Sequence, residues 1–411
     1  MTTQALAPRS DAERIRLAIV STHPIQYYAP VFRALAQSAQ VLPRIFYTWS
    51  QTAQGPVFDP GFGTRFTWDV PLLEGYDHVF VPNVASRPGS DHFSGVQNPG
   101  LTEAISGWGA DLVLIYGWNL QSHLRAMRYF KGRIPVLFRG DSTLLDARSP
   151  LRSLLRRVYL RWVYSHVDVA IAVGQNNRDY YQWCGLSPAR IAFAPHSVDT
   201  VRFRDADGEH AERAREWRKE LGISDDSVTF VFAAKLIAKK DPLLLLDAFM
   251  ALSSSAHLVY FGDGELEATL RERARAHANV HFLPFQNQRT MPAVYRLGDI
   301  YVLPSQGPGE TWGLAMNEAL ASGRPVIASS RVGGARDLVR EGRTGWVFEF
   351  KNGNDLARVM RAALTRGRDG LRRMGGNAQA LSREWSTEAA ADAIARAAVQ
   401  AFAARSVEAP R

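Results

Sequence analysis

Residues 301–330 read YVLPSQGPGETWGLAMNEALASGRPVIASS, and this stretch predicts a strand, a turn and a helix in immediate succession. The apolar run YVLP is typical of a buried strand, and the glycines and proline at 307–309 predict a turn. Gly313 then precedes the helical segment LAMNEALASG, which ends at Gly323 and Pro325. A buried strand that leads through a turn into a helix is the repeating unit of an α/β fold.

The same alternation fills the first half of the chain. Strands are predicted at 16–20, 43–47, 111–116, 135–139, 168–173 and 191–195. Helical stretches lie between them, near 28–38, 100–107, 120–131, 150–166 and 175–184. Near-continuous apolar strands separated by helices are typical of a parallel sheet covered on both faces.

The alternation restarts after a polar, charged stretch that ends near Gly222. We therefore expect two Rossmann-like, doubly wound α/β domains that face each other across a cleft, since ligands of such domains bind outside the carboxyl ends of the strands. The irregular segment 48–98 is expected to form loops over that cleft. The predicted boundaries are a disordered tail at 1–14, domains at 15–200 and 201–385, and a last segment at 386–411 whose helix can pack back on the first domain.

Composition narrows the class of protein. The chain has 411 residues, 46% of them hydrophobic, and its formal charge of +9 is compatible with anionic substrates, a membrane surface or nucleic acid. No nucleic-acid-binding module is found, so we expect no nucleic acid partner. The single cysteine, Cys184, fits a reducing cytosol, and neither a signal peptide nor a membrane-spanning apolar run is evident. A cytoplasmic protein is therefore expected.

Two acids flank the predicted helix start. Glu310 lies just before it and Glu318 inside it, while the first backbone N–H groups, near Gly313 and Leu314, have no partner within the helix. Such a helix end can bind a phosphate, and neighbouring carboxylates can accept hydrogen bonds from sugar hydroxyls. This arrangement suggests a nucleotide sugar as the ligand. The alternative is an ordinary helix with acids in its first turn and on its solvated face.

Basic residues follow the first strand of the second domain in the segment FAAKLIAKKDP, residues 232–242. Lys235 and Lys240 at the carboxyl end of that strand can neutralise a diphosphate as point charges. The alternative is a solvated basic loop, and Lys239 fits that description. Gly262, in the turn FGDGE, and the backbone near Phe285 can approach the nucleotide, although a simple strand-to-helix turn explains the glycine equally well.

These motifs together resemble those of the family 4 glycosyltransferases, which have the GT-B fold. GETWGLAMNEALASGRPVIAS is similar to the family's E-x7-E signature, and FAAKLIAKKDP is similar to its basic motif, in which Lys235 stands where an Arg is usual. The resemblance covers about residues 225–350. It implies a retaining transfer of sugar from a nucleotide-diphosphate donor without a metal ion or other cofactor.

The resemblance also implies roles for single residues. Lys235 and Lys240 bind the diphosphate, Glu318 the ribose and Glu310 the donor sugar. The backbone of Gly313 and Leu314 binds phosphate, next to Thr311 and Trp312. Glu310, Lys240 and Lys235 are thus the candidate catalytic residues.

The acceptor side depends on the first domain. STHPIQYYAPVFRALA (21–36) resembles an SHPIQY-type subset of the family and places His23, Gln26 and Tyr27 at the cleft mouth. A packing role is the alternative for His23, and His123 is expected to be a helix-face residue. Arg139 and Asp141 in FRGDS are either acceptor or leaving-phosphate contacts, or an ion pair that holds a loop. No residue is identified as a general base, and the leaving phosphate can accept the acceptor proton.

The segment 150–166 predicts an amphipathic helix. Five apolar side chains form one stripe, with arginines and no acid around them: Leu151, Leu154, Leu155, Val158 and Trp162. Peripheral docking on an anionic membrane is one interpretation. Its position between two predicted strands favours the other, in which the stripe is the core face of a crossover helix.

The predicted function is a retaining glycosyltransferase that moves a sugar from a UDP- or GDP-linked donor to a glycan, a lipid-linked acceptor or a small molecule. Two alternatives remain. One is a non-catalytic protein that binds a nucleotide sugar, and the other is a sugar-nucleotide epimerase or phosphorylase with the GT-B fold.

Overall fold

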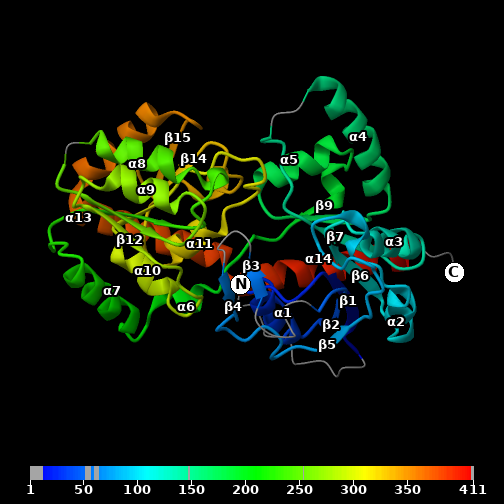
Figure 1. Ribbon diagram of the computed structural model, residues 1–411. Coiled ribbons are helices and arrows are strands. Elements are labelled where there is room, and N and C mark those ends of the chain that lie inside the picture. Colours follow the sequence, from blue (N-terminus) through cyan, green and yellow to red (C-terminus); the bar gives the residue numbers. More distant parts are fainter. Residues whose placement is uncertain (1–12, 51–56, 60–63, 147–148, 253, 409–411) are drawn as a thin grey trace. The chain divides into compact units, whose positions relative to one another are not determined.

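The chain forms two compact domains in the computed structural model, which describes residues 13–50, 57–59, 64–146, 149–252 and 254–408 (Figure 1). The first domain comprises residues 1–55, 71–196 and 387–411, and the second comprises 56–70 and 197–386. The predicted tail at 1–14 lies outside the described residues except for its last two positions.

A seven-stranded parallel sheet forms the centre of the first domain, in the order β5-β2-β1-β6-β7-β8-β9. Its strands are β1 (Ile15–Ser21), β2 (Val41–Tyr47), β5 (His78–Phe80), β6 (Leu112–Tyr116), β7 (Val136–Arg139), β8 (Val169–Ala172) and β9 (Ile191–Phe193). The helices are α1 (Ala29–Ala36), α2 (Leu101–Gly107), α3 (Gln121–Phe130), α4 (Pro150–Ser165), α5 (Gln175–Trp183) and α14 (Thr387–Glu408), with 3-10 turns at Phe93–Gly95 and Pro188–Arg190.

Alternate residues of each strand point to opposite faces of this sheet, as strand geometry requires. On β1, Ala18 and Val20 pack into one hydrophobic cluster, whereas Leu17 and Ile19 pack into the other. The second cluster includes α1 and, from the far end of the chain, the small apolar face of α14. The C-terminal helix is therefore part of the core of the first domain.

A six-stranded parallel sheet forms the centre of the second domain, in the order β12-β11-β10-β13-β14-β15. Its strands are β10 (Thr229–Ala233), β11 (His257–Phe261), β12 (Val280–Leu283), β13 (Ile300–Leu303), β14 (Val326–Ser329) and β15 (Gly345–Phe348). The helices are α6 (Thr200–Arg204), α7 (Glu209–Glu220), α8 (Pro242–Met250), α9 (Glu267–Ala274), α10 (Met291–Leu297), α11 (Leu314–Ala321), α12 (Ala335–Leu338) and α13 (Gly353–Ser382), with 3-10 turns at Ala238–Lys240 and Arg383–Trp385.

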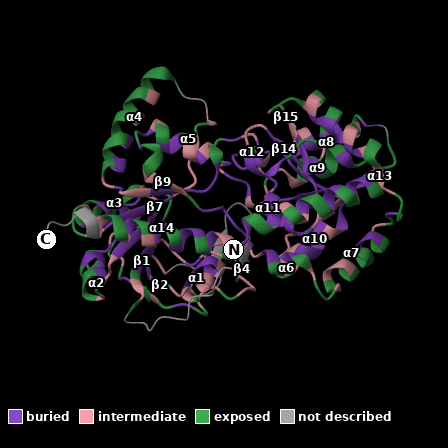
Figure 2. Ribbon diagram, turned by 180° about the vertical axis from the view of Figure 1, so that it is seen from behind, coloured by how far each residue is buried: buried purple, intermediate pink, exposed green. Residues whose placement is uncertain are grey.

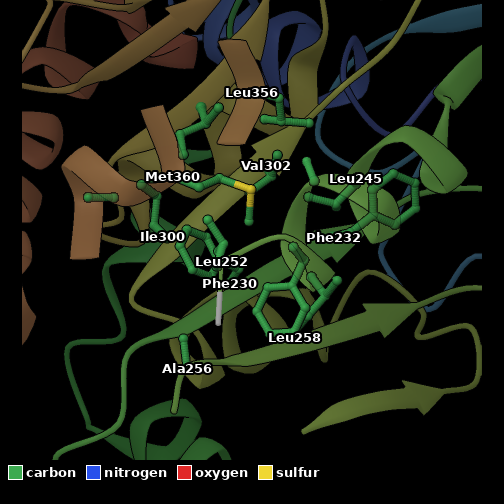
Figure 3. Close-up of a cluster of buried hydrophobic side chains, with 14 of the residues drawn as sticks. Phe230, Phe232, Leu245, Leu252, Ala256, Leu258, Ile300, Val302, Leu356 and Met360 are labelled. Carbon is green, nitrogen blue, oxygen red and sulfur yellow. The ribbon is translucent and has the colours of Figure 1, made fainter. Parts of the chain in front are cut away.

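One hydrophobic cluster of the second domain lies between the sheet and the helices α8 and α13 and consists of aromatic and aliphatic side chains (Figure 3). Phe232 of β10 lies beside Leu245 of α8, and Phe230 lies near Leu252, while Ile300 of β13 lies near Met360 of α13. A small antiparallel hairpin, β3 (Val57–Asp59) with β4 (Thr64–Phe66), also belongs to this domain. This packing holds the sheet rigid beneath the loops at its carboxyl edge.

The predicted α/β architecture is confirmed, and two helices differ from expectation. The sequence pattern predicts a helix near 353–366, and the observed helix α13 is longer, since it continues to Ser382 through a kink at Gly367, where φ is +60°. The second difference concerns α4. Its apolar stripe does not cover the sheet, because the side chains of Leu151, Leu155 and Val158 are more than 60% exposed. The core-face interpretation of that stripe was therefore wrong.

Candidate active site

The order of strands reverses once in each sheet, and several of the candidate residues lie in the loops at these two points. In the second domain, the chain runs from β10 outward to β12 and then returns to place β13 on the other side of β10. The loops that follow β10 and β13 therefore diverge and leave a crevice, which is where doubly wound sheets bind ligands. The first of these loops carries Lys235 and Lys240, and the second carries Glu310.

The structure brings Lys240 and Glu310 into direct contact. Lys240 Nζ donates to Glu310 Oε2 at 2.5 Å, and the two side chains are only 20% and 8% exposed. Lys239 was expected to be solvated, but its Nζ donates to the carbonyl oxygen of Gly309 at 2.8 Å. Gln306 adds two hydrogen bonds between the same two loops: its backbone N–H donates to the carbonyl oxygen of Lys239, and its side-chain amide donates to that of Ala238. The two loops are therefore joined into one polar unit. Lys235 lies half-buried in the loop after β10.

Glu318 lies inside α11 and is almost fully buried. The hydroxyl of Tyr295 donates to its Oε2 at 2.6 Å. Both glutamates are close enough to Tyr301 to raise its pKa, after the larger effect of burial. Glu310 and Glu318 thus share one negatively charged environment at the start of α11.

Gly313 caps α11 with φ of +90°, and a Cβ atom there would lie 2.8 Å from Val332 and 2.9 Å from Leu303. The close fit explains why a glycine precedes Leu314 and the first turn of the helix. Trp312 is buried against Trp385, with 5.2 Å between ring centroids. Its Nε1 donates to Asn317 Oδ1 at 2.8 Å. Trp312, next to the half-buried Thr311, supports the loop by packing.

Gly262 is required for loop packing. A Cβ atom there would lie 2.3 Å from the carbonyl oxygen of Ala234, and its φ is +128°. The turn after β11 is thereby held against the loop that carries the lysines, through the bond from the Leu236 N–H to Asp263 O. Phe285 is half-buried in the loop after β12. The simple-turn alternative therefore accounts for Gly262 without a ligand.

The sheet of the first domain reverses between β1 and β6. The loop after β1 carries His23, Gln26 and Tyr27, all half-buried. The ring of His23 stands edge-on to Trp49, with 5.6 Å between centroids, and burial lowers its pKa to about 4. His23 is therefore neutral at physiological pH, so one of its ring nitrogens can donate a hydrogen bond and the other can accept one.

A second polar cluster lies near the ends of β6, β7 and β9. Arg139 is buried and donates to the carbonyl oxygens of Ala194 and Pro195 at 3.0 and 2.8 Å. It thus holds the segment after β9. Asp141 is near enough to raise the pKa of Tyr28, after the larger effect of burial. It also opposes the fall in the pKa of His196, which burial and Arg139 lower to about 4.

A pocket of about 480 Å³ opens beside the loop after β2 in the same domain. Its lining is mainly apolar and includes Trp49, Phe80, Pro82 and Pro88. His23 contacts the Trp49 ring that lines it. Aromatic rings of this kind pack well on the apolar faces of sugars and of other flat ligands.

The sequence did not identify Tyr295, Tyr301 or His196 as members of these clusters. Each lies in or beside a predicted apolar element, where an aromatic or a single histidine carries no distinct signal. His123 was expected on a helix face, and it is on the inward face of α3, fully buried. Its Nδ1 lies 3.0 Å from Tyr116 O and its Nε2 lies 3.0 Å from the Thr48 hydroxyl. His123 therefore holds the loop after β6.

Comparison with known proteins gives two family matches that follow the two domains. Residues 61–202 match the model described as Glycosyltransferase Family 4, and residues 213–381 match the model described as Glycosyl transferases group 1.

Curated relatives carry a common name, D-inositol 3-phosphate glycosyltransferase. The protein of Geodermatophilus obscurus is 32% identical over 203 residues, which is 46% of this chain and 42% of the relative. That of Nocardia farcinica is 28% identical over 340 residues, 74% of this chain and 72% of the relative. The chain thus spans about half the length of most of the curated relatives it matches.

Solved structures share the fold at low identity. Anabaena HepE in complex with UDP and glucose has a TM-score of 0.68 at 17% identity, covering 94% of this chain and all of that one. Sucrose-phosphate synthase of Thermosynechococcus elongatus has a TM-score of 0.68 at 19% identity, covering 95% of this chain and all of that one. With both family matches, the paired parallel sheets and the E-x7-E helix, this chain belongs to the family 4 glycosyltransferases of the GT-B fold.

Proposed function

We propose that the protein is a retaining glycosyltransferase that uses a UDP- or GDP-linked sugar and delivers the sugar to a glycan, a lipid-linked acceptor or a small molecule. The observation that carries this proposal is the buried contact between Lys240 and Glu310 at the strand-order reversal of the second domain. It places an ammonium group and a carboxylate beside a helix N-terminus. A sugar diphosphate needs that combination, a cation for phosphate and an acceptor for hydroxyls.

In this proposal, the Lys240 ammonium turns from Glu310 to the diphosphate, together with Lys235 and the N–H groups of Gly313 and Leu314. Glu310 is then released to accept a hydroxyl of the donor sugar. Glu318, oriented by the Tyr295 hydroxyl, accepts the ribose hydroxyls. The lysines supply the positive charge that a divalent metal supplies in other transferases, so no metal or other cofactor is assigned.

The proposed reaction breaks the bond between the anomeric carbon and the diphosphate oxygen, and that oxygen takes the electron pair. The acceptor hydroxyl bonds to the anomeric carbon on the face that the leaving group vacates. Its proton passes to the leaving phosphate oxygen. The protein contributes positioning and charge stabilisation rather than a general base.

The acceptor is proposed to bind the first domain, near His23, Gln26, Tyr27 and Asp141. The pocket beside Trp49 offers an apolar wall for it. The names of the curated relatives make a phosphorylated polyol one acceptor to test, and the Anabaena structure makes UDP-glucose the first donor to test. A cytosolic site of action is part of the proposal.

The test is incubation of the full chain with radiolabelled UDP- and GDP-sugars. Transfer to an added acceptor, or slow donor hydrolysis, supports the transferase. Donor binding without turnover, across a panel of acceptors, would instead support the non-catalytic alternative. Formation of a sugar 1-phosphate or an epimerised donor would support a phosphorylase or an epimerase. The configuration of the new linkage, read by NMR, decides between retention and inversion.

A further inference from the structure

The helix α4 presents a continuous apolar surface to solvent. Its six exposed apolar side chains, here called the α4 stripe, are Leu151, Leu154, Leu155, Val158, Tyr159 and Trp162, which are 43–67% exposed. Only 13 large hydrophobic side chains are exposed in the whole described part of the chain, so nearly half of them lie on this one helix. Figure 2 shows α4 coloured mainly as exposed. So dense a patch marks an interaction site.

The opposite side of α4 already satisfies the need to cover the sheet. Leu160, Val163 and Tyr164 are buried and belong to the core of the first domain. With about 100° between successive residues, these three positions centre roughly 180° from the α4 stripe. The helix therefore has two apolar faces, and the fold uses only one of them.

Arginines flank the α4 stripe on both sides. Arg152 follows one edge, and Arg157 and Arg161 follow the other, whereas Arg156 is half-buried beside Tyr180. The sequence has no Asp or Glu from residue 147 to 167. The guanidinium of Arg128 on α3 lies over the Trp162 ring, 5.7 Å from its centroid, which adds a fourth positive charge at the same surface. The stripe is thus an apolar ridge with a basic border.

We propose that α4 docks on an anionic lipid surface, with the α4 stripe in the headgroup region and the arginines on lipid phosphates. A membrane interface fits both properties at once, because it accepts apolar and aromatic side chains beneath a layer of negative charge. Tyr159 and Trp162 have the amphipathic rings that favour this depth. A second copy of this chain fits less well, since it would bring the same arginines into opposition. The proposal does not depend on the proposed reaction.

Among the described residues, no helix has both the length and the apolar character to cross a bilayer. The docking that α4 provides is therefore of the peripheral kind, parallel to the surface. Its strength depends on buried apolar area and on attraction to anionic lipid together. Losing either contribution should weaken binding.

The experiment is flotation of the full chain with vesicles of phosphatidylcholine alone or with added phosphatidylglycerol. We expect binding to the anionic vesicles, weakened by salt, and little binding to the neutral ones. Leu155→Glu and Arg152→Glu should each weaken binding by roughly tenfold or more. Their matched controls are Val201→Glu, at a position 62% exposed on α6, and Arg373→Glu, at an exposed position on α13, and both should bind as the parent does.

Three results would overturn the proposal. They are no binding to anionic vesicles, equal binding to neutral vesicles, and unchanged binding by the two α4 variants. A concentration-dependent dimer that Leu155→Glu abolishes, without vesicle binding, would assign the stripe to a second copy instead. Donor hydrolysis measured without vesicles tests the proposed function separately, so the failure of one can be told from the failure of the other.

Discussion

At the scale of the residue, the contact between Lys240 and Glu310 is the feature with the clearest chemical consequence. Both groups are largely withdrawn from water, so each stabilises the charge of the other. A ligand with a negative diphosphate and neutral hydroxyls can take over both interactions together. The contact therefore holds the two side chains in place beside the start of α11.

Replacing Glu310 with Gln should lower turnover by about 100-fold to 1000-fold, because the amide keeps the shape but loses the charge that is proposed to act on the donor sugar. Donor affinity, measured by calorimetry, should change much less. The matched change Glu272→Gln, at an exposed position on α9, should leave the rate of donor hydrolysis unaltered. Equal losses in both variants would contradict the role given to Glu310.

Two buried histidines of the first domain predict a fall in stability on mild acidification. Burial lowers the pKa of both His123 and His196 to about 4, below the value near 6.5 of the unfolded chain. Between these values the unfolded chain binds more protons. Stability is thus fully present above about pH 6.5 and falls as the pH approaches 4, by on the order of 2 kcal/mol per histidine at pH 5.

Urea unfolding at pH 7 and pH 5, followed for the first domain, measures this effect. His123→Gln should reduce the difference between the two pH values, even if it lowers stability at both. His210→Gln in the second domain should leave the pH dependence of the first domain unchanged. A parent protein equally stable at both pH values would rule out the explanation.

At the scale of the element, the first turn of α11 depends on the glycine that caps it. Gly313→Ala adds a Cβ atom in a left-handed conformation against Val332 and Leu303, so we expect a loss of about 2–4 kcal/mol in the free energy of unfolding. Gly208 caps α7 with φ of +76° and has open space around it. Gly208→Ala should therefore cost about 1 kcal/mol, from backbone strain alone.

Chemical denaturation measures the loss in unfolding free energy for both variants, and titration calorimetry with the donor measures the change in donor affinity. Gly313→Ala should also weaken donor binding, since the N–H groups of the first turn must move. If the two glycine variants lost similar amounts of unfolding free energy, steric contact of the added Cβ atom at Gly313 would contribute little to the destabilisation.

At the scale of the whole molecule, the chain returns to its first domain after completing the second. Ile394 of α14 is fully buried in the first domain, and Met360 of α13 is fully buried in the second. Replacing either residue with Ala should lower the free energy of unfolding of its own domain by about 2–5 kcal/mol. Scanning calorimetry should show two unfolding transitions. Ile394→Ala should lower the midpoint temperature of one transition, and Met360→Ala should lower that of the other. If Ile394→Ala instead destabilised the second domain, the assignment of α14 to the core of the first domain would be wrong.

Much of this architecture could be predicted because it follows from local pattern. Each predicted strand of the first half overlaps an observed one, since a strand buried on both faces needs an uninterrupted apolar run such as LVLIY at Leu112–Tyr116. The α4 segment shows the limit. Its period identified a helix with an apolar stripe, but Leu160, Val163 and Tyr164 were the residues that met the sheet. The spacing of apolar residues shows that a helix has an apolar face, but it does not show which neighbouring element covers that face.

The sequence by itself determined that this chain makes two βα domains and that its acids and lysines follow strands, because those features depend on neighbouring residues. Only the tertiary structure decided that Lys240 meets Glu310 across 70 positions, that Tyr295 orients Glu318, and that α14 closes the core of the first domain. These contacts join surfaces far apart in the chain. Their partners are selected by shape and charge after the sheets have formed, and no local pattern encodes that choice.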